Sequence, residues 1–182
     1  MKIYTKAGDA GLTGLLGPGR FPKDDPRIEA YGAVDELNAA VGVARAAGAD
    51  PDADARLAKV QDDLFVVGSA LADPDPEGPF HEAVRPGQAA TLEAWIDELE
   101  ATLEPLTQFI LPGGTPTAAG IHLARTVCRR AEREVVRLTH QAGESVPSEI
   151  IVYLNRLSDF LFVLARAVNA RAGVADVPWT AP

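Results

Sequence analysis

Residues 26–47, PRIEAYGAVDELNAAVGVARAA, indicate the fold of the chain. The stretch begins with Pro26, and proline is favoured at the first position of a helix because its missing N–H has no helical partner there. Residues suited to a core recur at the three- to four-residue spacing of one helix face: Ile28, Tyr31, Val34 or Asp35, Leu37 or Asn38, and Val41. The pattern predicts an amphipathic helix.

The helical periodicity recurs in four further stretches, at about residues 52–72, 87–106, 115–141 and 147–172. The segments between them are rich in Pro, Gly and Asp, as connections between helices are. No run alternates convincingly between apolar and polar residues in the way a strand does. We therefore predict an all-α fold, a five-helix up-and-down bundle over residues 26–172, within a single domain of residues 1–182. The tail, residues 173–182, is expected to be extended or disordered.

The composition limits the class of protein. The 182 residues are 47% hydrophobic and 24% charged, which fits one globular domain with a substantial core. The chain lacks an apolar span of about 20 residues and a signal-peptide pattern at its start. Cys128 is the only cysteine, so an internal disulfide is impossible, and a net charge of −9 argues against nucleic-acid binding. We expect a cytoplasmic protein that binds neither membrane nor nucleic acid.

Positive charge is concentrated in two places. Three of the four lysines fall in the first 23 residues, and five of the thirteen arginines fall within residues 125–137. In the second group Arg125, Arg129 and Arg133 are spaced by four, so they lie along one helix face. Arginine binds phosphate or carboxylate through two hydrogen bonds. The group is therefore either an anion site or a solvated basic face paired with glutamates such as Glu132.

Two other predicted helices carry polar residues within apolar patterns. Asp35 lies among core-like positions of the first helix, and a carboxylate buried there would need a cationic partner, which the arginine row offers. Asn155 and Asp159 lie one turn apart among the leucines of the last helix, with Arg156 between them. These groups form either a structural network or a polar pocket between helices, and the coincidence favours the pocket.

The N-terminal stretch 5–20, TKAGDAGLTGLLGPGR, is rich in glycine. It matches neither a Walker A motif nor a dinucleotide fingerprint. Backbone N–H groups, with Lys6, Thr13 and Lys23 nearby, still allow it to hold an anion. The three histidines do not have zinc-site spacing, and neither a catalytic triad nor a Cys–His pair is evident. A Mg²⁺ ion would fit if it arrived with a nucleotide.

Five motifs occur in a recognisable order: TKAGDAGLTGLL, RFPKDDPRIEAYGAVDELNAAVG, FILPGGTP, ARTVCRRAEREV and YLNRLSDFLFVLAR. Over residues 2–171 the chain is similar to the PduO-type family of ATP:cob(I)alamin adenosyltransferases. The similarity implies a homotrimer with active sites between subunits. It also implies transfer of the 5′-deoxyadenosyl group of ATP to the cobalt of cob(I)alamin, giving adenosylcobalamin and triphosphate, with Mg²⁺ accompanying the nucleotide. The product would pass to an adenosylcobalamin-dependent enzyme.

The same resemblance assigns roles to residues. The loop of residues 1–25 would wrap the triphosphate of ATP and be mobile without it. Arg129 would be catalytic, and Asp35 would pair with Arg125 across the subunit interface, beside the cobalamin. Phe109 would close the lower face of the corrin. The expected ATP-binding residues are Thr5, Lys6, Ala7, Gly8, Thr13, Lys23, Arg129, Arg130, Glu132, Arg133 and Asn155.

Two alternatives differ from this enzyme. A non-catalytic carrier or sensor of nucleotide or cobalamin on the same bundle should have lost Arg129 or Lys23, and both are present. A small kinase is disfavoured because the Walker A motif is missing. In the adenosyl transfer, by contrast, cobalt(I) is itself the nucleophile, so a catalytic Ser, Cys or His is not needed.

Overall fold

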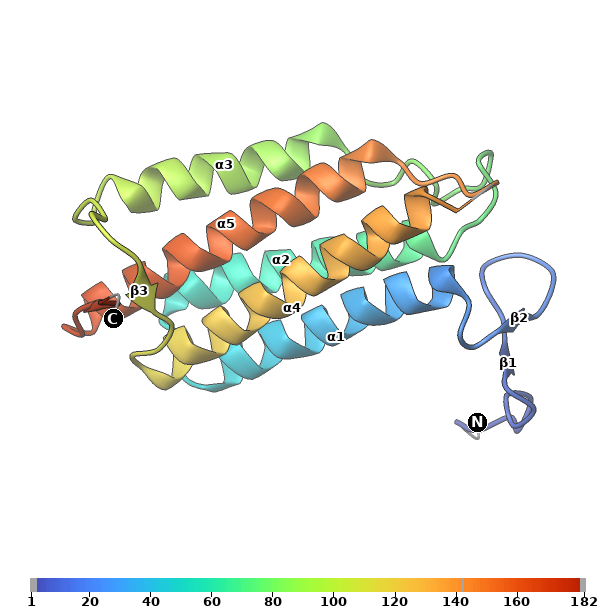
Figure 1. Cartoon of the computed structure of the whole chain (residues 1–182), viewed down its shortest axis with the longest axis horizontal. Helices are drawn as coiled ribbons and strands as arrows, with labels where there is room; N and C mark the ends of the chain where they lie inside the picture. The colour runs from blue at the N-terminus through green and yellow to red at the C-terminus, as the bar shows by residue number, and fades with distance from the viewer. Residues whose placement is uncertain (1–2, 142, 181–182) are drawn as a thin grey trace.

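A computed structural model of the chain describes residues 3–141 and 143–180. It contains five long helices, α1 (Pro26–Ala46), α2 (Pro51–Leu71), α3 (Pro86–Glu100), α4 (Pro116–Thr139) and α5 (Ser148–Arg171). Figure 1 shows them side by side, with α4 between α1 and α5, and α3 against α5. The predicted five-helix bundle is confirmed. The predicted loop and tail ranges extend over residues 1–2 and 181–182, which lie outside the described residues.

Local sequence explains where the helices begin and end. The first four start with a proline, and Thr115 caps α4 by accepting a hydrogen bond of 3.1 Å from the backbone N–H of Ala118. Asp25 caps α1 in the same way, through the N–H of Arg27 at 2.8 Å. After α5 the backbone turns at Gly173, whose φ of 69° favours glycine.

The third helix is shorter than predicted: it ends at Glu100 and not near residue 106. The backbone N–H and the hydroxyl of Thr102 both donate to the carbonyl of Leu99, which closes a turn. Leu103 still packs against the core from this turn, so the apolar periodicity continues where the helix does not.

Two short antiparallel ribbons were not predicted. One pairs β1 (Leu12–Thr13) with β2 (Phe21–Pro22) in the N-terminal loop. The other pairs β3 (Ile110–Leu111) with β4 (Val177–Pro178), and so fastens the tail to the segment before α4. The tail is therefore extended at these residues. Strands of two residues are too short to show an alternating pattern in the sequence.

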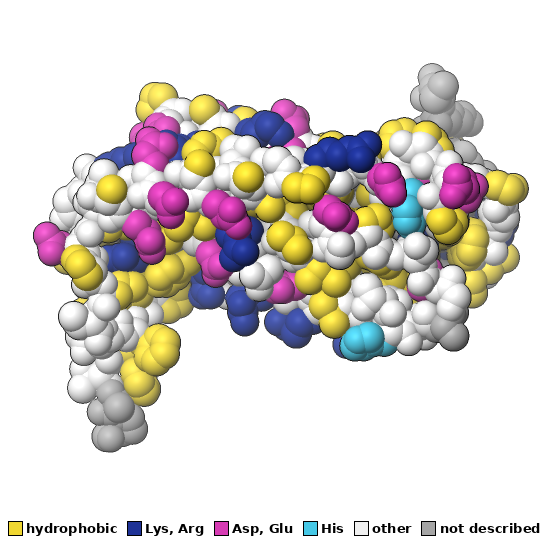
Figure 2. All heavy atoms as spheres, turned by 90° about the horizontal axis from the view of Figure 1, so that it is seen from above, with side chains coloured by type: hydrophobic (Ala, Val, Ile, Leu, Met, Phe, Trp, Pro, Cys, Tyr) yellow, Lys and Arg dark blue, Asp and Glu magenta, His cyan; other side chains and the backbone are white. Residues whose placement is uncertain are grey.

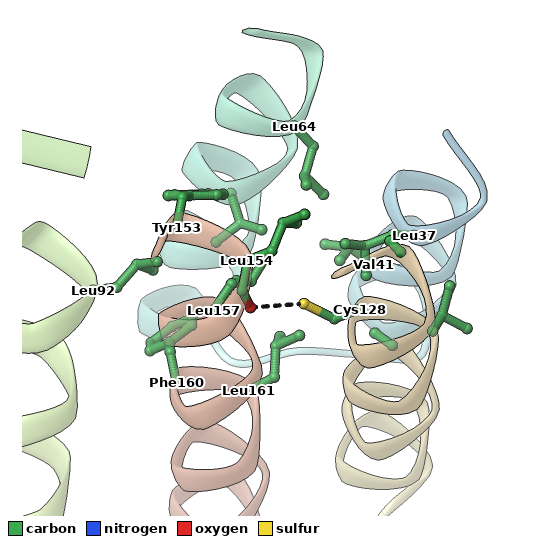
Figure 3. Packing of buried hydrophobic residues seen from close by; sticks show 14 of the residues in the cluster. Leu37, Val41, Leu64, Leu92, Cys128, Tyr153, Leu154, Leu157, Phe160 and Leu161 are labelled. Carbon is green, nitrogen blue, oxygen red and sulfur yellow. Dashed lines mark hydrogen bonds between the residues drawn. The ribbon is translucent and has the colours of Figure 1, made fainter. Parts of the chain in front are cut away.

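One apolar core runs between the helices. Figure 3 shows Leu37 and Val41 of α1, Leu64 of α2 and Leu154, Leu157 and Leu161 of α5 converging on Cys128 of α4. The Cys128 thiol donates to the carbonyl of Leu154 at 3.2 Å, and burial raises its pKa far above the ordinary value. The helices α1 and α4 approach most closely at Gly120. A Cβ added there would lie 3.0 Å from the Cα of Ala44. None of the helices in the described ranges has the length and hydropathy to span a membrane.

A buried arginine joins three segments at the end of the bundle that carries the N-terminal loop. Arg27, 2% exposed, forms an ion pair with Glu144 and donates to the carbonyl of Leu71 at 2.8 Å. Nearby, the backbone N–H of Leu16 donates to the carbonyl of Ala72 at 2.9 Å. The start of α1, the end of α2 and the N-terminal loop are thus tied together.

The close approach of α1 and α4 predicts that Gly120→Val destabilises the fold. The added side chain would meet the backbone of Ala44, and we expect unfolding free energy to fall by about 1–3 kcal/mol, as in overpacked cores. Gly68→Ala in α2 is the matched control, because a Cβ at Gly68 meets nothing within 4 Å. Urea unfolding followed by circular dichroism measures both. Equal stability of the Gly120→Val variant and the parent chain would contradict the packing described here.

Candidate functional site

The arginine row lies on the surface of α4, opposite its core-facing side. Arg129 and Arg133 are exposed, and Arg125 is half-buried. Arg133 donates to the backbone carbonyl of Arg129 at 2.9 Å. Within the described residues, the guanidinium of Arg129 has neither a hydrogen bond nor an ion pair. All the N–H donors of this guanidinium are therefore available to a ligand.

Neighbouring carboxylates contact other polar residues of this face. Arg130 forms an ion pair of 2.5 Å with Glu36 of α1. Asn155 of α5 donates to Glu132 at 3.0 Å. The interpretation of the cluster as a basic face paired with glutamates thus holds for Arg130, which is paired with Glu36, whereas Arg129 has no such partner among the described residues. The predicted ATP-binding residues of α4 and α5 lie on one continuous face.

Asp35 and Arg125 do not form an ion pair within the chain. Asp35 is exposed, whereas its neighbour Val34 faces the core at 1% exposure. The guanidinium of Arg125 lies over the ring of Phe162, with its carbon 5.9 Å from the ring centroid, and its buried Nε has no partner among the described residues. Burial, and then the charge of Arg129, lower the pKa of Arg125. Asp35, Arg129 and Asn155 are all exposed. Asp35 lines a cavity of about 270 Å³ between α1 and α2, and neither Arg129 nor Asn155 belongs to the lining of that cavity.

The N-terminal loop is organised around two basic side chains. Arg20 donates through Nη2 to the carbonyls of Ala7 and Leu12, the latter at 3.0 Å. The ammonium group of Lys23 lies beside Gly8, where an added Cβ would be 3.2 Å from Nζ. Lys6 adopts a left-handed φ of 61°. The loop thus brings Lys23 beside Gly8 and is fastened by Arg20.

Sequence reasoning did not single out Arg20. The available signal was a cation directly after Gly19, at the end of the glycine-rich stretch and directly before FPK. The guanidinium of Arg20 satisfies the carbonyls of Ala7 and Leu12. The backbone N–H groups of Asp9 and Gly11 donate within the same loop, to the carbonyls of Lys6 and Gly8.

Phe109 lies at the other end of the bundle. Its side chain is 79% exposed, and Leu111, Val177 and Trp179 of the same ribbon are about half exposed. The intervening Ile110 and Pro178 line a cavity of about 500 Å³ under the ribbon. Alternation along the two strands therefore presents an apolar outer face, with Phe109 its most exposed member. The N-terminal ribbon and β3 lie at opposite ends of the bundle (Figure 1).

The face of the molecule that bears α3 does not concentrate one sign of charge. Figure 2 views the molecule from the side that bears α3, where acidic and basic side chains are interspersed. On this side Arg156 is paired with Glu93 at 2.8 Å and with Asp159 at 3.5 Å, so Asp159 belongs to a salt-bridge network. No group of three or more His, Cys, Asp or Glu side chains within residues 3–141 and 143–180 could hold a metal ion.

Fold and site together define a helical-bundle protein with an exposed row of arginines on α4. A family model described as cobalamin adenosyltransferase matches residues 3–168. The chain belongs to this family.

Relatives of known name share most of the chain. The corrinoid adenosyltransferase of Bacillus subtilis is 44% identical over 98% of this chain and 92% of its own length. The corrinoid adenosyltransferase of Mycobacterium tuberculosis strain H37Rv has the same identity and coverage. The corrinoid adenosyltransferase PduO of Salmonella typhimurium is 42% identical over 97% of this chain and 52% of its own length.

Solved structures have the same fold. A phenylalanine-to-alanine variant of the PduO-type ATP:corrinoid adenosyltransferase from Lactobacillus reuteri, complexed with cobalamin and ATP, superposes with a TM-score of 0.91. It is 36% identical, and the match covers 99% of this chain and 100% of that one. An arginine-to-lysine variant of that enzyme, complexed with ATP, gives a TM-score of 0.90 at 36% identity, covering 98% and 100% of the two chains.

A buried histidine beside the arginine row predicts a pH-dependent stability. His122 is 4% exposed, its Nδ1 has no partner within the described residues, and its ring packs on Phe162. Burial, and then the charge of Arg125, lower the pKa of His122, against a smaller opposing effect of Asp176. His122 therefore binds a proton near pH 6.5 in the unfolded chain, but only at lower pH in the folded chain. The free energy of unfolding accordingly falls as the pH drops below about 6.5.

We expect His122→Gln to reduce this loss of stability between pH 7.5 and 5.5, measured by urea unfolding at each pH. His140→Gln, at an exposed position, is the matched control. Parallel pH profiles for His122→Gln and the parent chain would rule out this role of His122.

Proposed function

We propose that the protein transfers the 5′-deoxyadenosyl group of ATP to the cobalt of cob(I)alamin, forming adenosylcobalamin and triphosphate. The observation that carries this proposal is the unpartnered guanidinium of Arg129 on the exposed face of α4. The relatives support it, because the L. reuteri enzyme of the same fold was solved with cobalamin and ATP.

The electron balance of the reaction explains the kind of site. The lone pair of cobalt(I) attacks C5′ of the ribose, the Co–C5′ bond forms and the C5′–O bond breaks. The electron pair of the broken bond leaves with the triphosphate. The protein's task is to align cobalt with C5′ and to stabilise the negative charge that accumulates on the leaving group. Arg129 is the residue to which we assign this stabilisation.

Other residues would hold ATP. In the N-terminal loop these are the predicted group of Thr5, Lys6, Ala7, Gly8, Thr13 and Lys23. On the helices they are Arg130, Glu132, Arg133 and Asn155. Arg130 would exchange its ion pair with Glu36 for a phosphate oxygen. That the loop becomes ordered only on ATP binding stays a prediction.

Mg²⁺ would be held mainly by the triphosphate. The described residues form no cluster of three acidic or histidine side chains, and this fits an ion that keeps phosphate and water ligands and adds one or two carboxylates. Bound to the phosphates, Mg²⁺ would neutralise part of their charge. We place the reaction in the cytoplasm, because a reducing compartment preserves cobalt(I), and expect an adenosylcobalamin-dependent enzyme to receive the product.

Phe109 would face the corrin. The phenylalanine and the arginine that are replaced in the L. reuteri variants have the same separation along their chain as Phe109 and Arg129 here. An exposed aromatic ring beside Leu111 provides an apolar surface that excludes water from the lower side of cobalt. Loss of the lower axial ligand makes cobalt easier to reduce.

The geometry of one chain supports a site shared between subunits. The N-terminal loop and Phe109 lie at opposite ends of a bundle whose helix α4, with 24 residues, is about 36 Å long. C5′ is attached to the triphosphate and becomes bonded to cobalt, so the groups that hold the two substrates must lie close together. Two copies of the chain satisfy both conditions. We propose a homotrimer, with Asp35 of one subunit paired to Arg125 of the next.

Purified protein with Mg²⁺-ATP and chemically reduced cobalamin, kept free of oxygen, should show the spectral change from cob(I)alamin to adenosylcobalamin. Arg129→Ala should lower kcat by about 10²–10³-fold, as the loss of one transition-state donor does elsewhere. Arg137→Ala is the matched control, because Arg137 lies on the same helix but is paired with Glu134 at 2.7 Å. A folded parent protein without turnover would reject the enzymatic proposal and favour a carrier. Arg129→Ala within a few-fold of the parent would reject only the role of Arg129.

A mixed oligomer tests the shared site. Lys23→Ala and Phe109→Ala chains, each nearly inactive alone, are co-expressed with different tags and purified through both. In a cyclic trimer with head-to-tail interfaces, every mixed trimer has one interface where an intact loop meets an intact Phe109. We expect about one third of the parent turnover in these trimers, with their mass measured by analytical ultracentrifugation. Mixed trimers that are no more active than the separate variants would place both residues in the same subunit's site.

A further inference from the structure

Phe109 is held through its backbone and not through packing of its ring. At 79% exposure the ring has few neighbours, and the strand β3, which begins directly after Phe109, has only two residues. The position of the ring therefore depends on what fixes the chain on both sides of it. The side chains and backbone groups that fix the chain on both sides of Phe109 belong to the last turns of α5 and to the tail.

Arg166 holds the side of the segment that precedes Phe109. This residue of α5 is 7% exposed, and its Nη2 donates to the carbonyl of Glu104 at 2.7 Å. Its Nε donates to Asp176 of the tail at 2.8 Å. One buried guanidinium thus joins the connection after α3 to the strand that pairs with β3.

Asn169 holds the side that follows Phe109. It is 4% exposed, donates to the carbonyl of Gly113 at 2.9 Å and accepts from the backbone N–H of Thr115 at 2.9 Å. Gly114, between these two, has a φ of 103°, and a Cβ there would collide with the amide of Asn169. The Asn169 side chain therefore fixes the turn that leads from β3 into α4.

The tail contacts Phe109 and the strand β3 directly. The backbone N–H of Trp179 donates to the carbonyl of Phe109 itself at 2.8 Å, and Val177 and Pro178 pair with Leu111 and Ile110. The tail strand is in turn fixed by the ion pair between Asp176 and Arg166.

We propose that Arg166 and Asn169 are positioning residues for Phe109, and that Asp176 completes their frame by holding the tail strand against β3. The inference rests on the proposed function, since it takes Phe109 as the residue that faces the corrin. A misplacement of about 1 Å in a site that aligns reacting groups costs up to about 10²-fold in rate, so an exposed ring needs such a frame. None of the three residues touches substrate in this scheme.

The test compares Asp176→Asn and Asn169→Ala with the parent enzyme under oxygen-free conditions. KM is measured separately for cob(I)alamin and for ATP, and the fraction of four-coordinate cob(II)alamin formed with ATP is measured by its absorption and electron paramagnetic resonance spectra. We expect KM for the corrinoid to rise about 10-fold or more and the four-coordinate fraction to fall. KM for ATP should stay within two-fold, and Asp176→Glu should restore the parent values.

Asp54→Asn is the matched control. It removes a comparable ion pair, with Arg45 at 2.7 Å, where α1 meets α2, and touches neither β3 nor the tail. If the parent enzyme turns over and the corrinoid KM and four-coordinate fraction of both test variants equal those of Asp54→Asn, the positioning role is wrong. A parent protein without turnover rejects the proposed function instead. Should Asn169→Ala fail to fold, Asp176→Asn, at a partly exposed position, decides the question alone.

Discussion

The close packing of α1 against α4 determines how the arginine row of α4 is presented. Because Gly120 lacks a side chain, the backbones of the two helices approach until an added Cβ would be 3.0 Å from the Cα of Ala44. This approach aligns the remaining turns of the two helices and brings Glu36 to 2.5 Å from Arg130. It also turns Cys128 and its apolar neighbours inward, so that Arg129 and Arg133 must face outward. The same packing that buries one side of α4 therefore exposes a row of cations on the other.

The sequence predicted the helices well because local chemistry sets their starts. Pro26 and Thr115 act only on the turn that follows them, and the structure confirms both roles. Periodicity was less exact about faces and ends. Val34 and Asp35 differ by one position, or about 100° around the helix, and only the tertiary packing shows that Val34 is the buried one. Leu103 prolonged the apolar pattern of α3 beyond its last helical residue.

Features that depend on contacts between distant segments could not be predicted in the same way. Asn169 lies near the end of α5 and belongs to no motif, and its role depends on a turn far away in the sequence, at Gly113 and Thr115. The pairing of β3 with β4 joins residues separated by the whole of α4 and α5. Arg20 was overlooked for a related reason, because carbonyls of Ala7 and Leu12 are partners that a motif of side chains does not reveal.

The placement of the two substrate-facing segments has a further consequence for the chemistry. Arg129, near the middle of α4, and the N-terminal loop carry positive charge, whereas the outer face of the β3–β4 ribbon is apolar. A leaving triphosphate needs charge and water-like donors, and a cobalt ion stripped of its lower ligand needs an apolar, dry wall. In one chain these two regions lie at different places along the bundle. In the proposed homotrimer, assembly would bring the charged region of one copy and the apolar wall of another together where a new interface excludes solvent, and there the charge of Arg129 would act most strongly.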